Sequence, residues 1–267
     1  MANRANCISI LQITDLHILP SPKDTLLGVN THDYFRAVLD LAYVNKPHYD
    51  LILLTGDLAQ EPCSSSYQQI LAGLLPRKTR CICLPGNHDD VELMQQILTY
   101  ESVSCQKQLF LDNWQLICLN SQIPGSAGGC LPDQELSFLQ QCLHNFPDLY
   151  SLIAVHHHCL ETQSAWMDTM MIENSPLLFS ILSAYPNAKV ITTGHIHQMM
   201  DQSAGGVRVL GTPSTCFQFK PDSHDFGLDI TSPGYRTIDL YADGGIETQV
   251  VRLPEPLVGL QFNSQGY

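Results

Sequence analysis

Short, almost wholly apolar segments recur along this chain, and each is followed at once by polar residues. The clearest is residues 51–54, Leu-Ile-Leu-Leu, which precede Gly56 and Asp57. A continuous apolar run of this length is typical of a strand in a sheet that is covered on both faces. Segments with helical periodicity lie between such runs, so the chain is expected to form an α/β fold.

The tetrapeptide Gly-Asn-His-Asp at residues 86–89 follows another apolar run, residues 81–84, and Pro85. The Pro-Gly pair predicts a tight turn between a strand and the helix that we expect from Val91 onward. In an open α/β sheet, ligands bind where the strands end. An amide, an imidazole and a carboxylate in a row suit a metal-assisted hydrolytic site, although the same residues are common in ordinary turns.

The remaining pattern predicts one domain at residues 1–253 and a peripheral tail at 254–267. Because both halves are rich in strands, two packed sheets flanked by helices are favoured over one long sheet. The strands are expected at 7–13, 50–55, 81–85, 115–120, 152–155, 190–193, 207–210, 235–241 and 247–253, with a turn at 243–245. The helices are expected at 31–45, 65–75, 91–100, 132–143 (with Pro132 in the first turn) and 176–185.

Composition describes an ordinary globular protein, with 44% hydrophobic and 15% charged residues. The formal net charge of −13 argues against nucleic acid or an anionic membrane as the main partner. The polar start, residues 1–6, predicts no signal peptide, and no segment is apolar enough to predict a membrane span, so a cytoplasmic location is expected. The ten cysteines include no CxxC pair, which disfavours a redox enzyme and predicts buried or free thiols.

Five of the expected strands end in side chains that can bind metal ions. Imidazole, carboxylate and amide donors together suit divalent cations such as Mn²⁺, Fe²⁺ or Zn²⁺. The i, i+2 spacing of Asp15 and His17, and of His195 and His197, suggests an extended backbone, in which alternate side chains share a face. Each motif alone is also consistent with turn chemistry, and of the three histidines at 156–158 one is expected to be a ligand. The candidate ligands are Asp15, His17, Asp57, Asn87, His156, His195 and His197.

Taken together, the motifs D-x-H, G-D, G-N-H-D, H and G-H-x-H resemble the calcineurin-like metallophosphoesterase superfamily from about residue 7 to 253. Further segments, such as 11–15, 27–31, 56–60, 194–198 and 212–216, are similar to the bacterial class III cyclic AMP phosphodiesterases. The resemblance implies a four-layer α/β/β/α sandwich with two divalent metal ions, Fe²⁺ or Mn²⁺ first and Zn²⁺ as an alternative. Cys159 stands where the family has proline, which removes no ligand.

Carried over motif by motif, the resemblance implies a role for each candidate residue. His88 would contact the substrate phosphate and protonate the leaving group, and Asp89 would fix the orientation and tautomer of His88. The first metal would be held by Asp15, His17, Asp57 and His197; Asp57 would bridge; and Asn87, His156 and His195 would complete the second site. The substrate would lie against His17, Asp57, Asn87, His88 and His197.

The implied reaction is hydrolysis of 3′,5′-cyclic AMP to 5′-AMP by a metal-bound hydroxide, which would control the level of the nucleotide. Two alternatives stay open: a phosphodiesterase of this fold for glycerophosphodiesters or nucleotide conjugates, and a non-catalytic scaffold. The oligomeric state, monomer or dimer, is also open. Residues that could stack on adenine or meet phosphate, although core or surface roles are simpler for each, are Phe217, Phe219, Tyr235, Trp166, Lys220 and Arg236.

Overall fold

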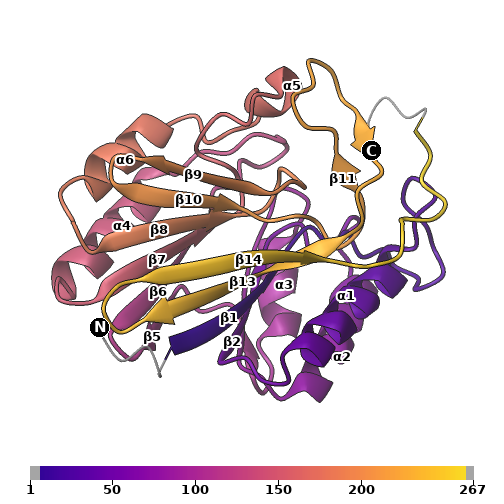
Figure 1. Cartoon of the computed structure of the whole chain (residues 1–267), viewed down its shortest axis with the longest axis horizontal. Helices are drawn as coiled ribbons and strands as arrows, with labels where there is room; N and C mark the ends of the chain where they lie inside the picture. The colour runs from indigo at the N-terminus through magenta and orange to yellow at the C-terminus, as the bar shows by residue number, and fades with distance from the viewer. Residues whose placement is uncertain (1–6, 263–267) are drawn as a thin grey trace.

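The computed structural model describes residues 7–262 and contains two six-stranded sheets (Figure 1). The first sheet has the strand order β14-β13-β1-β2-β3-β4. Its four strands β1 to β4 are parallel, and β13 pairs antiparallel with both β1 and β14. The strands are β1 (Cys7–Ile13), β2 (Leu51–Thr55), β3 (Cys81–Leu84), β4 (Val103–Ser104), β13 (Gly234–Tyr241) and β14 (Ile246–Arg252).

The second sheet has the strand order β5-β6-β7-β8-β10-β9. Strands β6, β7, β8 and β10 are parallel, and the edge strands β5 and β9 are antiparallel to their neighbours. The strands are β5 (Gln108–Leu111), β6 (Trp114–Leu119), β7 (Tyr150–Val155), β8 (Ala188–Thr193), β9 (Met200–Ala204) and β10 (Val207–Gly211). A small separate ribbon pairs β11 (Gln218–Phe219) with β12 (Leu228–Asp229).

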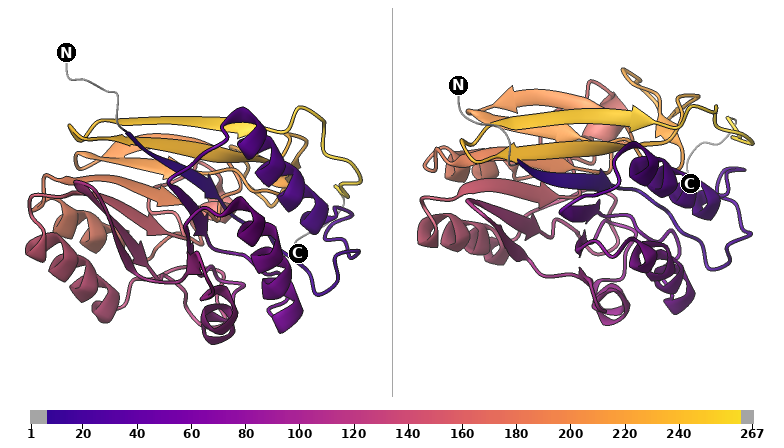
Figure 2. Two further views of the ribbon diagram at one scale, coloured as in Figure 1. Left: turned by 90° about the horizontal axis from the view of Figure 1, so that it is seen from below. Right: turned by 60° about the horizontal axis from the view of Figure 1, so that its bottom comes forward.

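Helices cover the outer faces of the two sheets, which gives four layers (Figures 1 and 2). The first group is α1 (Thr31–Asn45), α2 (Ser64–Leu74), the 3₁₀ turn η1 (Leu75–Arg77) and α3 (Val91–Leu98). The second group is α4 (Asp133–Asn145), the short α5 (Ala165–Asp168) and α6 (Ser175–Leu182). The expected α/β/β/α sandwich of two packed mixed sheets is therefore confirmed.

Strand β2 shows why its whole run is apolar. Leu51 and Leu53 pack between the sheets, in the same core as Leu116 and Leu152 of the second sheet. The alternate residues of β2 face the core beneath α1, α2 and α3. Because both faces of the strand are buried, residues 51–54 are all apolar, and the polar residue at its end, Thr55, has its hydroxyl hydrogen-bonded to Gln12.

The expected helices and long strands are present, with small shifts at their ends. Helix α1 begins as predicted, since the Asn30 side chain accepts a hydrogen bond from the Asp33 amide at 2.9 Å. Pro132 lies at the N-cap of α4, one position before the first turn. Strands β4, β5, β9, β11 and β12 and helix α5 are not predicted from the sequence, because they are short or polar on one side and so have weak periodicity.

The described part of the tail, residues 254–262, lies against the loop before α1. The Gln261 amide donates to the Leu27 carbonyl at 2.9 Å, and Gly28 and Gly259 are in backbone contact. Residues 1–6, which suggested the absence of a signal peptide, and residues 263–267 of the tail lie outside the described part. All ten cysteines are free thiols, and six are buried. No helix within residues 7–262 is long and apolar enough to cross a membrane.

Arg236 of β13 joins the two sheets through a buried guanidinium, so the structure does not place it at a phosphate. Its Nη2 donates to the carbonyls of Gly211 at 2.7 Å and Met200 at 3.1 Å in the second sheet. Its Nε and Nη1 donate to Thr212 and Thr248. Burial lowers the pKa of this guanidinium to about 10, which leaves the group charged at neutral pH.

We expect Arg236→Ala to lower the free energy of unfolding by roughly 2–5 kcal/mol, because it removes the buried guanidinium that donates to two carbonyls of the second sheet. Urea unfolding followed by circular dichroism would measure the loss. Arg208→Ala is the matched control: Arg208 forms an ion pair with Asp201 and is partly exposed, so its loss should stay below about 1 kcal/mol. Equal losses in the two variants would contradict the inter-sheet role.

Candidate metal centre

The seven candidate ligands follow strands β1, β2 and β3 of the first sheet and β7 and β8 of the second. Strands of a parallel sheet all end at the same edge, so these loops meet at one place. Asp15, His17, Asp57, His156 and His197 are at most 1% exposed, and His195 is 6% exposed. A cluster of polar side chains this deeply buried requires mutual hydrogen bonds or a bound ion.

The first group of side chains contains one carboxylate and two imidazoles. The Nε2 atoms of His17 and His197 face each other at 3.2 Å. The Nε2 of His197 also lies 3.4 Å from the Oδ1 of Asp15. One ligand atom from each of the three residues lies within 4.8 Å of the others, so a single cation can contact all three.

Asp57 lies between this group and a second one. Its Oδ2 is 3.9 Å from the Nε2 of His17 and 3.3 Å from the Nε2 of His156. The same nitrogen of His156 lies 3.1 Å from the Oδ1 of Asn87. One carboxylate oxygen therefore faces both groups, which is the position that a bridging ligand between two metals requires.

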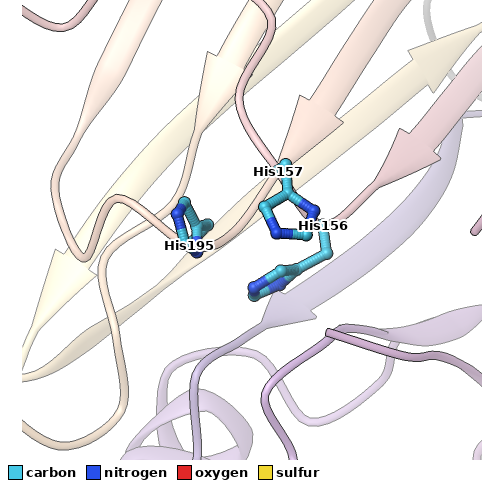
Figure 3. Close-up of side chains that lie close together, drawn as sticks. All are labelled: His156, His157 and His195. Carbon is cyan, nitrogen blue, oxygen red and sulfur yellow. The ribbon is translucent and has the colours of Figure 1, made fainter. Parts of the chain in front are cut away.

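The second group also contains His195 and, in addition, His157, which is not among the candidate ligands predicted from the sequence. Figure 3 shows His195 beside His156 and His157, and one nitrogen from each lies within 4.8 Å of the other two. His157 is buried with its Nδ1 2.7 Å from the Ser121 hydroxyl. The Nε2 atoms of His157 and His195 are buried without a hydrogen-bond partner among the described residues. The histidine triplet was the only signal for His157.

In three of the histidines, the Nδ1 atom faces away from the cluster and lies within hydrogen-bond distance of an oxygen. The Nδ1 of His17 lies 2.7 Å from the Gln60 side-chain oxygen. The Nδ1 atoms of His156 and His197 lie 2.8 Å and 2.9 Å from the carbonyls of Thr55 and Phe217. An oxygen acceptor holds the proton on Nδ1 and leaves the Nε2 lone pair free for a metal.

The backbone of these loops differs from the extended form that the i, i+2 spacing suggested. The φ angle is positive at five candidate ligands, namely Asp15, His17, Asp57, His195 and His197, with values between 47° and 67°. Each pair therefore lies in a left-handed turn beyond its strand. The spacing brings the side chains together because of the turn and not because of strand geometry.

Close backbone approach explains why glycine stands beside the ligands. A Cβ on Gly86 would lie 2.2 Å from the Asp57 Oδ1, and one on Gly194 would lie 2.9 Å from the Asp15 Oδ2. Both distances are shorter than any tolerable contact, so a larger residue would displace the carboxylates.

Burial and the two carboxylates set the charges in the cluster. Burial lowers the pKa of His17 to about 3 and holds that of His195 well below its usual value, so both rings are neutral. Burial opposes a charge on His156, but the Asp57 carboxylate raises its pKa to about 9. Burial likewise opposes the Asp57 charge, and His156 holds the pKa of Asp57 well below its usual range. Binding a cation here would release a proton from His156.

Asp89 has contacts different from those predicted. Its carboxylate accepts from the amides of Gly86, Leu58 and Ala59 at 2.9–3.1 Å and from the Tyr67 hydroxyl at 3.0 Å. Every hydrogen bond it receives from the described residues comes from these groups and not from the His88 ring. Asp89 thus fastens the loops that carry Asp57 and Asn87 to each other, and its effect on His88 is through the backbone.

His88 lies at the edge of the cluster and is partly exposed. Its amide donates to the Asp57 Oδ1 at 3.0 Å, and its ring centroid is 5.1 Å from that of His17. One nitrogen of its ring can join His17 and Asp57 around a common point. This position is reachable by a molecule from solvent, which the fully buried candidate ligands are not.

The donor set fits a pair of divalent cations. Neutral imidazoles, two carboxylates and one amide suit Mn²⁺, Fe²⁺ or Zn²⁺, whereas Mg²⁺ and Ca²⁺ prefer oxygen donors alone. Such ions would bind the buried ring nitrogens that have no hydrogen-bond partner among the described residues and the Asp57 carboxylate that faces both groups. The arrangement is therefore competent for two-metal hydrolytic chemistry on a phosphate ester.

The family comparison agrees with this description. The model of the calcineurin-like phosphoesterases matches residues 8–199, which contain every candidate ligand. The chain belongs to the calcineurin-like phosphoesterase family, whose members use a dimetal centre.

The chain is also similar to curated proteins along nearly its whole length. It is 41% identical to the 3′,5′-cyclic adenosine monophosphate phosphodiesterase CpdA of Vibrio vulnificus, covering 98% of this chain and 96% of the relative. It is 39% identical to the protein of the same name from Escherichia coli K12, covering 97% and 95%. A 3′,5′-cyclic-nucleotide phosphodiesterase of Nostoc is 38% identical over 96% of this chain and 98% of that protein.

Solved structures share the fold at much lower identity. A dimetal phosphatase from Danio rerio has a TM-score of 0.62 and 13% identity, covering 92% of this chain and 99% of that one. GAP50 of Plasmodium has a TM-score of 0.64 and 10% identity, covering 97% and 90%. At such identities the likeness concerns the fold alone.

Asp57→Ala should remove metal from both positions, because one oxygen of this carboxylate faces both groups. Mass spectrometry of the purified protein should find the content falling from about two ions per chain to well below one. Asp201→Ala, which changes a surface ion pair, serves as the control and should keep both ions. Full metal content in Asp57→Ala would rule out the bridging position.

Proposed function

We propose that this chain is a two-metal phosphodiesterase that hydrolyses 3′,5′-cyclic AMP to 5′-AMP. The observation that carries the proposal is the position of Asp57, whose Oδ2 faces His17 of one group and His156 of the other. Nearly full-length relatives carry the name of this activity, which supports cyclic AMP as the substrate. The proposed ligands are Asp15, His17, Asp57 and His197 for the first metal and Asp57, Asn87, His156 and His195 for the second.

Two divalent cations, Fe²⁺ or Mn²⁺ first, would polarise the phosphoryl oxygens and lower the pKa of an attacking water. The ring of His88, at the accessible edge, donates a proton to the 3′ oxygen as the phosphorus–oxygen bond breaks. Asp57 orients His88 by accepting its amide hydrogen at 3.0 Å. Asp89 keeps the loops of Asp57 and Asn87 in register through the amides of Leu58 and Gly86.

The proposal places the enzyme in the cytoplasm, with a free small molecule as its substrate. A formal charge of −13 disfavours nucleic acid and anionic surfaces as partners. It does not prevent a cyclic nucleotide from binding, because four positive charges on two cations exceed the two carboxylates Asp15 and Asp57.

The direct test is hydrolysis of cyclic AMP by protein stripped of metal and reloaded separately with Fe²⁺, Mn²⁺ or Zn²⁺. We expect 5′-AMP as the product, and kcat/KM for cyclic AMP should exceed that for glycerophosphodiesters by at least about tenfold. Glycerophosphoethanolamine and a nucleoside diphosphate conjugate are the competitors. A higher kcat/KM for either would reassign the substrate, and no turnover of any ester would favour the scaffold.

His88→Ala should lower kcat for cyclic AMP by roughly 100- to 10,000-fold, the usual range for loss of a general acid. Both metals should stay bound, because the other ligands are intact. His48→Ala, a change of an exposed histidine, is the control for the loss of an imidazole. If His88→Ala lost its metals together with its activity, the proton-donor role would be wrong.

A further inference from the structure

A cavity of about 330 Å³ opens beside the proposed metal centre. Its side away from the proposed ligands and His88 is lined by residues to which the proposed function assigns no role. Asn87, His88 and His195 from the strand ends line it together with Trp166, Met170 and Phe226 from segments distant in the chain. Its volume is at the lower end of the range for small-molecule sites, so it suits one compact ligand and not a peptide or an oligonucleotide.

Three aromatic side chains, Trp166, Phe219 and Phe226, form one continuous wall of this cavity. The Trp166 ring meets Phe219 at 5.0 Å and 88° and Phe226 at 5.2 Å and 74°. Phe219 is in turn stacked on His197 at 4.2 Å and 22°. The aromatic wall is therefore in direct contact with a proposed ligand of the first metal, and perpendicular packing fixes the plane of the indole.

Short helix α5 carries Trp166 and is held to the same strand ends. The Asp168 carboxylate accepts from the amide and the hydroxyl of Thr162 at 2.7 and 2.8 Å. It also lies 3.5 Å from the Nε2 of the buried His158, two residues after the ligand His156. The Ser164 hydroxyl accepts the amide of Ser223 from the loop that holds Phe226. These contacts place Trp166 before any ligand arrives, which lowers the entropic cost of binding.

The chemistry of the cavity indicates what lies against the wall. No lysine, arginine, aspartate or glutamate is among its lining residues, so the occupant of the apolar part is uncharged. The three rings pack against one another, with Phe219 and Phe226 at 5.8 Å, and so form a continuous surface. A cage for a quaternary ammonium group would require rings on separate sides of the cation. A flat, neutral, aromatic group fits this surface best.

We infer that Trp166 is the stacking platform for the purine base of the substrate, with its phosphate beside Asn87, His88 and His195. This inference rests on the proposed function and names the specificity residue of the same site. It also selects one of the aromatic candidates from the sequence: Phe217 is fully buried, and Tyr235 is buried in the core beneath the helices, where its hydroxyl accepts from Asn45.

The kinetic test compares Trp166→Ala, Trp166→Phe and wild type, each loaded with Mn²⁺, on three substrates. Base–aromatic stacking binds ground state and transition state alike, so Trp166→Ala should raise KM for cyclic AMP by about fivefold or more with kcat nearly unchanged. Hydrolysis of methyl p-nitrophenyl phosphate, which has no base, should not change. In Trp166→Ala the preference for cyclic AMP over cyclic CMP should fall, because a pyrimidine stacks less strongly than a purine and so loses less. Trp166→Phe should keep most of this preference.

Phe110→Ala is the matched control, since Phe110 is a half-exposed aromatic residue on β5, paired with the start of β6 and not with its end. Phe110→Ala should leave KM and kcat unchanged for all three substrates. Equal losses on all three substrates in Trp166→Ala would show a structural role and overturn the inference, as would an unchanged KM for cyclic AMP. Glycerophosphocholine is assayed as an additional substrate, and a loss confined to it would overturn the inference and replace the base by a choline head group.

A binding measurement separates this inference from the proposed function. The chain has two tryptophans, and Trp114 is fully buried between the sheets. 5′-AMP should quench the fluorescence of the metal-loaded wild type saturably, ribose 5-phosphate should not, and Trp166→Phe should abolish the effect. Absence of cyclic AMP hydrolysis with intact quenching would reject the activity alone. Hydrolysis without quenching, and without a KM effect in Trp166→Ala, would reject the platform alone.

Discussion

Left-handed backbone turns at the strand ends are the constraint on which the site depends. The left-handed conformation raises the conformational free energy of a residue other than glycine by about 1–2 kcal/mol, yet five proposed ligands adopt it. The turns after β1 and β2 hold each other, since the amides of Asp15 and His17 donate to the carbonyls of Gly56 and Asp57 at 3.0 Å. Neither turn can relax to an ordinary conformation without breaking these bonds, so the strain is retained and the imidazoles stay directed at one point.

A buried polar network centred on Gln12 of β1 supports these turns from the strands that precede them. The Gln12 amide nitrogen donates to Thr55 and to the Thr193 carbonyl, and its oxygen accepts from the hydroxyls of Thr192 and Thr212. All its partners lie on strands or loops that lead into the metal centre. A fully satisfied network in a low-dielectric interior is rigid, because any displacement leaves a buried group unpaired. The ends of the two sheets are thereby kept in register at the site.

The sequence was informative where chemistry is local and weak where it depends on packing. Strands such as β2, buried on both faces, and the cluster of polar side chains at the strand ends were predictable, because apolar runs and polar exits are both visible in the residue order. Trp166 was one of several aromatic candidates, and its selection was not predictable, because it depends on contacts with Phe219 and Phe226, which lie more than 50 residues further along the chain. The family resemblance implied that Asp89 orients His88, but its carboxylate oxygens accept hydrogen bonds from amides in another loop, which no local pattern reveals.

A metal centre at the proposed ligands would lie across the junction of the two sheets, so its occupancy would be linked to the stability of the fold. Asp15 and Asp57 extend from the first sheet, and His156 and His197 from the second, so a cation bound between them opposes separation of the layers. A ligand that binds only the folded state stabilises it in proportion to the logarithm of its free concentration. A chelator would then act on this molecule as a mild denaturant, and metal starvation in the cell would shorten the lifetime of the protein as well as silence it.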